Sequence, residues 1–414
     1  MMWTNQARIQ RDIEELAKYN ATPGQGLTRF SLTAEDRAAR GYLRQQMQDC
    51  GLRVYEDAAG NLVGRREGEL TDAPVVMIGS HFDSVKGGGN FDGPAGVSAA
   101  LETARVLHER GIKTRYPIEV VAMIEEEGAR FSASLYGSRA MAGLIEVSQL
   151  QERKDAADIS MYDALRDFGF RPDAIGTARR LPGSVRAFLE LHIEQGPILE
   201  AEGLDVGIVQ EIVGIHDMKV KFQGRQGHAG TIPMHLRADA LVAAAKAVAR
   251  IAELAVEEGG GTVATVGWLS VKPGGFNIIP GEVEFSVDIR SGKRQHVDHV
   301  SRRIGEVLAE ITDGTGVVAE LSSLMNVAPV QMAESIVARQ KAICERLGLK
   351  YRLMQSGAGH DAMVMAGISQ VGLVFVPSLN GRSHCPEEWT DYAQLQKGAE
   401  VYLHTVMELA EVVA

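Results

Sequence analysis

The sequence predicts an α/β fold in two domains: a mostly parallel sheet with helices on both faces, and a smaller α+β domain inserted into it. The length of 414 residues exceeds what one ordinary hydrophobic core accommodates. Before about residue 213 and after about 330, continuous apolar runs alternate with segments of helical periodicity, which is typical of βαβ units. Between these positions the pattern changes to a β-α-β-β-α-β order, which indicates a ferredoxin-like domain.

The larger domain is expected to comprise residues 1–213 and 330–414, and the inserted domain residues 214–329. Thr33 is placed to cap the second helix of the larger domain, and Gly51 to end it. The elements expected in the larger domain are helices over 5–20, 34–50, 95–110, 334–347 and 391–411, and strands near Arg53–Tyr55, Asn61–Val63, 75–79, Ile118–Ile124 and Val371–Phe375. Those expected in the inserted domain are strands Met218–Phe222, Thr262–Val271, Val283–Asp288 and Val317–Leu321, and helices over 236–256 and 294–312.

The composition is that of a soluble globular protein, with 45% hydrophobic and 23% charged residues. A net charge of −11 argues against nucleic acid or an anionic membrane as a partner. No apolar stretch reaches the length of a transmembrane helix, and the first residues lack a signal-peptide pattern. Cys50, Cys344 and Cys385 are odd in number and widely spaced, which does not suit a disulfide framework. We therefore expect a reducing, cytoplasmic setting.

A histidine and two aspartates follow the apolar strand at 75–79. His81 and Asp83 come directly after the strand, and Asp92 follows a short glycine run. In open α/β sheets the ligand sites lie at the carboxyl ends of the strands. Because imidazole and carboxylate together suit a divalent metal ion, this segment predicts part of a metal site.

Three adjacent carboxylates, Glu125, Glu126 and Glu127, end the second apolar strand. At the end of a buried strand they repel one another and lose hydration unless a cation neutralises them. A solvated acidic loop is the alternative interpretation of this run on its own. Two further histidines are placed in the same way, His192 on a short strand and His384 after an apolar strand, and four such strand ends together favour the metal interpretation.

Taken in order, these motifs resemble the M20 metallopeptidase-like amidohydrolases, and within them the hydantoinase/carbamoylase branch. This branch contains N-carbamoyl-L-amino-acid hydrolases, β-ureidopropionases and allantoate amidohydrolases. The resemblance covers nearly the whole chain. It rests on Gly79-Ser80-His81-x-Asp83-Ser84, Phe91-Asp92-Gly93, the triple glutamate, His192-Ile193-Glu194-Gln195-Gly196, Ser383-His384, Gly227-His228-Ala229-Gly230, Asn277-Ile278-Ile279-Pro280-Gly281 and Asp288-Ile289-Arg290.

The resemblance implies a centre of two divalent ions per subunit, for which zinc, manganese, cobalt and nickel are all acceptable. By matching, Asp92 bridges the two ions, His81 and His192 complete one ion site, and Glu127 and His384 complete the other. A bridging carboxylate lowers the repulsion between two cations. Asp83 stands behind His81 and fixes the orientation of its ring.

The remaining site residues are carried over in the same way. Glu126 becomes the free carboxylate that takes a proton from the attacking water and passes it to the leaving nitrogen. The inserted domain mediates dimerisation and acts as a lid, and its His228 reaches the partner subunit's site to stabilise an oxyanion. The substrate-binding residues implied are Gln195, Asn277, Arg290, Gly357 and Ala358, with Asn277 and Arg290 on the substrate carboxylate.

The activity implied is hydrolysis of N-carbamoyl-L-amino acids to the L-amino acid, ammonia and carbon dioxide by a homodimer. Allantoate or a β-ureido acid is the alternative substrate, because its ureido and carboxylate groups are similarly placed. A dipeptidase and a catalytically silent binding protein are further alternatives, and the second is disfavoured because all five ligands and Glu126 are present.

Overall fold

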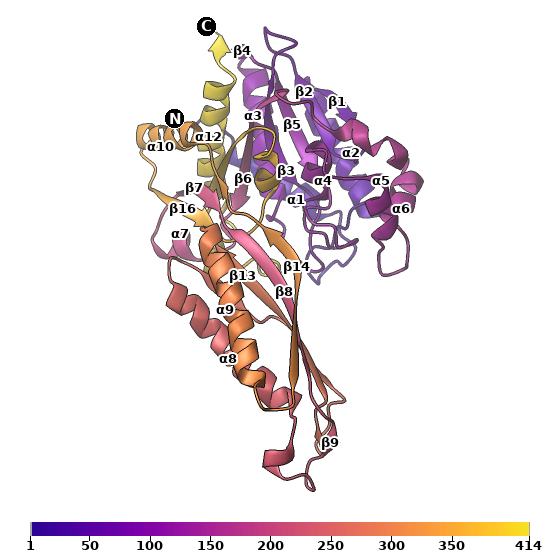
Figure 1. Ribbon diagram of the computed structural model, residues 1–414. Helices are drawn as coiled ribbons and strands as arrows, with labels where there is room; N and C mark the ends of the chain where they lie inside the picture. Colours follow the sequence, from indigo (N-terminus) through magenta and orange to yellow (C-terminus); the bar gives the residue numbers. More distant parts are fainter. Residues whose placement is uncertain (1, 414) are drawn as a thin grey trace. The chain divides into compact units, whose positions relative to one another are not determined.

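The computed structural model describes residues 2–413, which divide into two compact units (Figure 1). One unit comprises the described residues up to Gln210 and from Met332 onward, and the other comprises Glu211–Gln331. Among the described residues, no helix is both long enough and apolar enough to cross a bilayer. Cys50, Cys344 and Cys385 carry free thiols.

The first unit is an α/β structure. Its helices are α1 (Gln6–Ala17), α2 (Ala34–Asp49), α3 (Pro94–Glu109), α4 (Tyr136–Met141), α5 (Val147–Glu152), α6 (Met161–Phe168), α7 (Ile198–Ala201), α10 (Glu334–Leu347), α11 (Asp361–Met365) and α12 (Tyr392–Leu409). Its strands are β1 (Arg53–Glu56), β2 (Leu62–Arg66), β3 (Val75–His81), β4 (Lys113–Thr114), β5 (Ile118–Met123), β6 (Val185–Ile193), β16 (Tyr351–Ser356), β17 (Gln370–Val376) and β18 (Val412–Val413), while β7 (Val206–Ile212) runs across the boundary.

The main sheet is parallel at its centre and antiparallel at its flanks. The strand order is β1-β2-β5-β3-β6-β17-β7, and the four strands β5, β3, β6 and β17 run in the same direction. The outer pairs β1–β2, β2–β5 and β17–β7 are antiparallel. The segment between Glu56 and Leu62 is too short for a parallel crossover, which needs about a dozen residues, so β1 and β2 form a hairpin.

Strand β6 separates the apolar core from the functional side of the sheet. Leu189, Leu191 and Ile193 belong to the core that α3 and α12 share. Because successive side chains of a strand point to opposite faces, Glu190 and His192 point the other way. On that face the amide of Ala362, at the start of α11, donates to Glu190.

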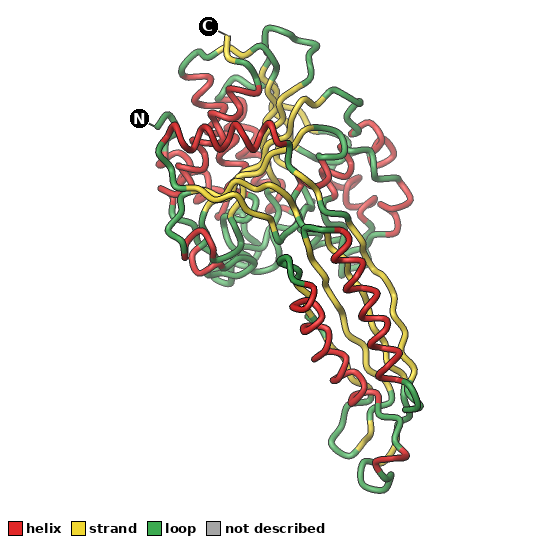
Figure 2. The backbone as a smooth tube through the Cα atoms, turned by 60° about the vertical axis from the view of Figure 1, so that its left-hand side comes forward, coloured by secondary structure: helices red, strands yellow, loops and turns green. Residues whose placement is uncertain are grey.

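The second unit contains a five-stranded antiparallel sheet with two long helices. Its elements are β8 (Gly214–Gln223), β9 (Gly227–His228), α8 (Ala240–Glu258), β10 (Val263–Thr265), β11 (Leu269–Lys272), β12 (Ile278–Ile279), β13 (Glu282–Ser291), α9 (Arg294–Thr312), β14 (Val318–Val327) and β15 (Val330–Gln331). The sheet order is β10-β13-β8-β14, and β11 also pairs with β13. Helices α8 and α9 lie along these strands (Figure 2).

Two details of the second unit differ from the sequence-based expectation. The strand expected over Thr262–Val271 is two strands, β10 and β11, which pair with different parts of β13. Between β10 and β11 the regular strand pairing is interrupted. Here the Trp268 amide donates to the Ser286 hydroxyl, and the Ser286 amide donates to the Trp268 carbonyl. The last strand, β14, is longer than Val317–Leu321 and continues past a bulge between Ser323 and Met325.

Candidate metal centre

The four parallel strands of the first unit deliver polar side chains to one edge of the sheet. His81 is the last residue of β3, Glu125–Glu127 follow β5, and His192 lies one residue before the end of β6. The loop after β17 carries His384, and Asp92 lies just before α3. Since these strand ends are parallel neighbours, their side chains converge without any unusual path of the chain.

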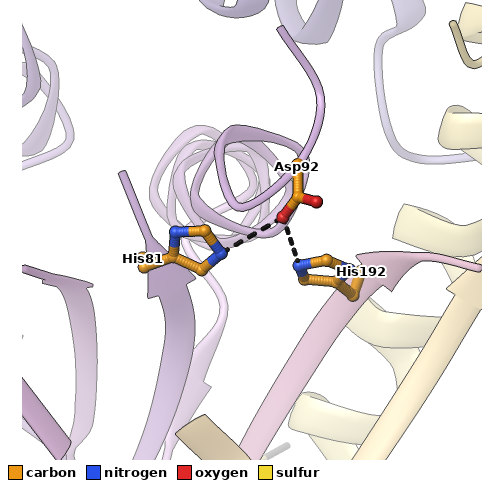
Figure 3. Close-up of side chains that lie close together, drawn as sticks. All are labelled: His81, Asp92 and His192. Atoms are coloured by element: carbon orange, nitrogen blue, oxygen red, sulfur yellow. Dashed lines mark ion pairs between the residues drawn. The ribbon is translucent and has the colours of Figure 1, made fainter. Parts of the chain in front are cut away.

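Asp92 lies at the middle of the cluster. Its Oδ1 is 3.1 Å from His192 Nε2 and 3.4 Å from His81 Nε2 (Figure 3). Its Oδ2 is 3.2 Å from His384 Nε2, which in turn lies 3.5 Å from Glu127 Oε1. The potential ligands form three overlapping sets, with the ligand atoms of each set within 4.8 Å of one another: His81, Asp92 and His192; Asp92, Glu127 and His384; and His81, Glu126 and Glu127. The first two sets share Asp92.

The ring orientations of the two buried histidines fit a metal ion. His81 Nδ1 lies 3.2 Å from the main-chain oxygen of Asp83, and His192 Nδ1 lies 2.9 Å from that of Ile193. A carbonyl oxygen only accepts, so each Nδ1 carries the proton and each Nε2 of a neutral ring presents a lone pair. Both lone pairs face the Asp92 carboxylate, and acceptor facing acceptor is favourable only with positive charge between them, either a proton or a metal ion. The donor set therefore fits a divalent ion.

The electrostatics of the cluster point the same way. Burial works to lower the pKa of His81, but Glu126, Asp83 and Asp92 outweigh it and hold the pKa well above its usual value. Burial, with repulsion from Asp92, raises the pKa of Glu127 to about 7, although His81 and His384 act to lower it. At this cluster the glutamate is harder to ionise than usual, and the histidine is easier to protonate than usual. Both shifts indicate a site that positive charge stabilises.

Asp83 contacts the cluster in two ways. Its main-chain oxygen accepts from His81 Nδ1, whereas its Oδ1 lies farther from the same nitrogen, at 3.6 Å. The carboxylate accepts instead from the amides of Glu126, at 3.1 Å, and Glu127, at 3.2 Å. The side chain of Asp83 therefore holds the acidic segment after β5, and its backbone orients the histidine.

The three consecutive glutamates take different positions. Glu127 belongs to two of the ligand sets and Glu126 to one, in which Glu126 Oε2 lies 3.9 Å from His81 Nε2. Burial raises the pKa of Glu126 well above its usual value, with contributions from Glu127, Asp361 and Asp83, while His81 acts to lower it. Glu125 turns away and accepts from the amides of Arg130 and Phe131, which closes the following loop.

Three non-glycine residues at the site have left-handed backbone conformations. The φ angles are 54° at Glu125, 56° at Gln195 and 57° at His384. Such conformations cost energy for residues with a Cβ and concentrate at functional sites. In Gln195 the strained backbone places the side-chain amide 2.6 Å from Asp92 Oδ2, to which Nε2 donates. The residue expected to contact a substrate thus contacts the central aspartate here.

Two carboxylates that the sequence did not single out support the cluster. Glu190 accepts from the Ser80 hydroxyl at 2.7 Å and from the amide of Ala362 at 3.0 Å. Glu388 accepts from the amides of Phe91 and Asp92. Position is the only sequence signal for either residue, because Glu190 precedes His192 by two residues and Glu388 follows His384 by four.

The other expected site residues lie in a loop of the first unit and in the second unit. Gly357 and Ala358 lie between β16 and α11, where the Ser356 hydroxyl closes a turn by donating to the Ala358 carbonyl. His228 is an exposed residue of β9, and the Ala229 amide donates to the Asn277 carbonyl beside it.

Arg290 lies near the C-terminal end of β13, where its guanidinium donates two hydrogen bonds to the Asp288 carboxylate at 2.8–2.9 Å. Glu282, at the N-terminal end of β13, pairs with Gln223, and these two residues lie within a few positions of β12 and β9 in the sequence. At about 3.3 Å per residue, Arg290 is on the order of 25 Å from that end. Within one chain, Arg290 therefore does not share a small ligand with His228 and Asn277.

A ligand-bearing edge of a parallel sheet, covered by helices, is typical of α/β enzymes. The chain matches the peptidase family M20/M25/M40 over residues 77–408. It is 46% identical to an N-carbamoyl-L-amino-acid amidohydrolase of Paenarthrobacter aurescens, over 97% of both chains. It is 35% identical to the allantoate amidohydrolase of Escherichia coli, again over 97% of both. The structure of a hydantoinase/carbamoylase family amidase from Burkholderia multivorans superposes with a TM-score of 0.89 at 35% identity, covering 98% of each chain.

The chain therefore belongs to the M20/M25/M40 family, and it is a hydrolase that acts on amides.

Proposed function

We propose that this protein hydrolyses the carbamoyl C–N bond of N-carbamoyl-L-amino acids with the help of two divalent metal ions. The products are the L-amino acid and carbamate, which decomposes to ammonia and carbon dioxide. The observation that carries the proposal is the position of Asp92, whose two oxygens each face a separate set of ligands. The relative from Paenarthrobacter aurescens supports the choice of substrate class.

The residues present fit two ions that share a carboxylate. His81 and His192 would hold one, Glu127 and His384 the other, and Asp92 both. When bound, zinc, manganese, cobalt or nickel ions supply Lewis acidity and lower the pKa of a coordinated water. Such acidity makes hydrolysis of an otherwise inert ureido group feasible near neutral pH.

Glu126 is the proposed proton carrier. Its side chain is at the cluster, and its amide is fixed by Asp83. Burial and neighbouring carboxylates raise its pKa, which makes it a stronger base than an ordinary glutamate. In the proposed reaction it removes a proton from the attacking water and delivers it to the departing amino-acid nitrogen.

Arg290 is proposed to bind the substrate carboxylate. It lines a cavity of about 590 Å³ on the face of the second unit's sheet that lacks helices. A guanidinium fork matches a carboxylate in two parallel hydrogen bonds, which Arg290 already makes with Asp288. Gln195, Gly357 and Ala358 are proposed to line the rest of the substrate site.

His228 and Asn277 are proposed to act in the partner subunit of a homodimer. The amide of Gly230 donates to His228 Nδ1 at 3.1 Å, so the neutral ring carries its proton on the exposed Nε2. That nitrogen is a free donor suited to an oxyanion. Apolar side chains surround this region and remain exposed: Phe276 fully, Met234 by 72% and Leu236 by 54%.

The second unit is proposed to be a ferredoxin-like dimerisation and lid domain. Its β-α-β-β-α-β order and the sheet order β10-β13-β8-β14 support the ferredoxin-like assignment. The edge strand β14 exposes Leu321, Leu324 and Met325, and a long apolar edge is suited to pairing with a second copy.

Allantoate remains the alternative substrate, because the relative from Escherichia coli acts on it and both compounds combine a ureido group with a carboxylate. The two are distinguished by the rate of ammonia release from N-carbamoyl-L-methionine and from allantoate, and cleavage of a dipeptide is followed under the same conditions by the release of free amino acid. We expect the highest kcat/KM with N-carbamoyl-L-methionine. Faster turnover of allantoate would replace the proposed substrate, and peptide cleavage alone would reject the ureido class.

A further inference from the structure

We propose that Glu388 is a positioning residue that connects the segment carrying Asp92 to the loop carrying His384, and thereby sets the geometry of the second ligand set. This inference rests on the proposed two-metal function. It assigns Glu388 no contact with substrate or metal. Its task is to hold two ligands that come from distant parts of the chain.

The carboxylate of Glu388 contacts both segments at once. Its Oε1 accepts from the amides of Phe91, at 2.9 Å, and Asp92, at 3.0 Å. Its Oε2 lies 2.8 Å from the hydroxyl oxygen of Ser383, the residue before His384. That same hydroxyl oxygen is 2.7 Å from Asp92 Oδ2. A circuit of close polar contacts therefore runs from Glu388 through Ser383 to the central aspartate and back through its amide, and the single Ser383 hydroxyl donates to one of the two carboxylates at a time.

The connection spans almost the whole first unit in sequence. The bond to Phe91 joins residues 297 positions apart, so no local turn can replace it. Glu388 is 4% exposed, and the two amides and the shared hydroxyl offset part of the desolvation of its carboxylate. Alongside it, the ring of Phe91 packs edge-on against Trp389 at 5.1 Å. The two segments thus meet through the polar contacts of Glu388 and the apolar contact between Phe91 and Trp389.

The segment before Asp92 is shaped to let the carboxylate approach. A Cβ at Gly89 would collide with the Glu388 side chain, so glycine alone leaves room there. On the other side, His384 has a strained backbone, with φ of 57°. A strained loop keeps its conformation only when its surroundings determine it, and the bonds through Ser383 and Glu388 do so.

A matched pair of controls exists in the same chain. Glu400 is a fully buried carboxylate that accepts from two adjacent amides, of Trp3 and Thr4, and from the Thr4 hydroxyl. It makes the same kinds of bond as Glu388 but belongs to none of the ligand sets. Glu387 is the exposed neighbour of Glu388 and pairs only loosely with Arg382, at 3.8 Å.

The test compares Glu388→Ala, Glu388→Gln, Glu400→Ala and Glu387→Ala by metal content after dialysis, by titration with Co²⁺ followed through its visible absorption, and by kcat and KM. We expect Glu388→Ala to bind the second ion, the one at Asp92, Glu127 and His384, roughly 10–100-fold more weakly than wild type and to show an altered Co²⁺ spectrum. Its kcat should fall by a larger factor than its KM changes. Glu388→Gln should retain most of the wild-type metal affinity, Co²⁺ spectrum and kcat, because its side-chain oxygen can accept from both amides and its NH₂ can donate to Ser383. Glu400→Ala should lower Tm without changing metal binding, and Glu387→Ala should change neither.

Ser383→Ala provides a second route if Glu388→Ala does not fold, because it breaks the circuit at a half-buried hydroxyl and leaves the amide bonds intact. It too should weaken the second ion and alter the Co²⁺ spectrum. The inference is overturned if Glu388→Ala, or Ser383→Ala in its place, binds two ions with wild-type affinity and spectrum. A wild-type protein that binds fewer than two ions would instead contradict the proposed function, and this inference with it.

Discussion

Each buried histidine of the cluster is oriented by the main chain next to it. The carbonyl of Asp83 fixes His81, and that of Ile193 fixes His192, so both rings present Nε2 to Asp92. This arrangement needs no further side chain for the tautomer, which frees the Asp83 carboxylate to hold the amides of Glu126 and Glu127. Each side chain at the site therefore has one main task.

At this scale the proposed proton carrier is directly testable. Glu126→Gln keeps the size of the side chain but cannot take up a proton, so we expect kcat for ammonia release to fall roughly 10²–10⁴-fold. Metal content should stay at the wild-type level because Glu126 is not among the proposed ligands. The check is steady-state kinetics together with elemental analysis. Wild-type kcat in the variant would remove Glu126 from this role.

The ligands could be predicted from the sequence because each lies at the carboxyl end of an apolar strand or in the loop after it, and parallel strands end at a common edge. The residues that support these ligands could not be predicted in this way. Glu388 acts across 297 positions, and nothing in the local pattern around it indicates its partner. Similarly, the contact of Gln195 with Asp92 depends on a left-handed backbone that no motif encodes.

Among the elements, those with strong periodicity were predicted best. Thr33 caps α2 by accepting from the Asp36 amide, as predicted, and α10 and α9 match their expected ranges. The antiparallel flank of the main sheet was not predicted, because the apolar pattern of a strand carries no direction. The short helices α4, α5 and α6 were also missed, since one or two turns give too little periodicity to recognise.

Helix α12 is tied to the start of the chain by Glu400, and this contact predicts a pH dependence. Burial acts to raise the pKa of Glu400, but bonds from His404, Thr4 and Trp3 outweigh it and lower the pKa to about 2, from an ordinary value of 4.5. The stabilisation is therefore complete above pH 4.5 and is lost as the pH falls towards 2. At about 1.4 kcal/mol for each pKa unit, its size is at most about 3 kcal/mol.

Glu400→Gln removes this contribution. We expect the free energy of unfolding of the metal-free variant to be lower than that of the metal-free wild type at pH 7, with a difference that shrinks by pH 3. Urea unfolding at the two pH values measures it. A difference that is equal at both would show that ionisation of Glu400 does not stabilise the fold.

For the whole molecule, the proposed dimer predicts complementation between inactive subunits. His228→Ala and Glu126→Gln homodimers should both be slow, because each lacks one proposed function in every site. After subunit exchange, a hybrid dimer regains one site with both residues, so ammonia release should partly recover. Mixing two preparations of Glu126→Gln is the control. No recovery despite proven exchange would place His228 outside the partner's site.

The central claim is that Asp92 joins two ion sites in one chain, and the number of ions per chain tests it most directly. The measurement is elemental analysis of dialysed protein, followed by chelation and stepwise return of Mn²⁺ or Zn²⁺ while ammonia release is recorded. We predict two ions per chain, loss of activity on chelation, and recovery that is complete only when the second ion is bound. A stoichiometry of one, or ammonia release that persists after complete removal of metal, would contradict the account.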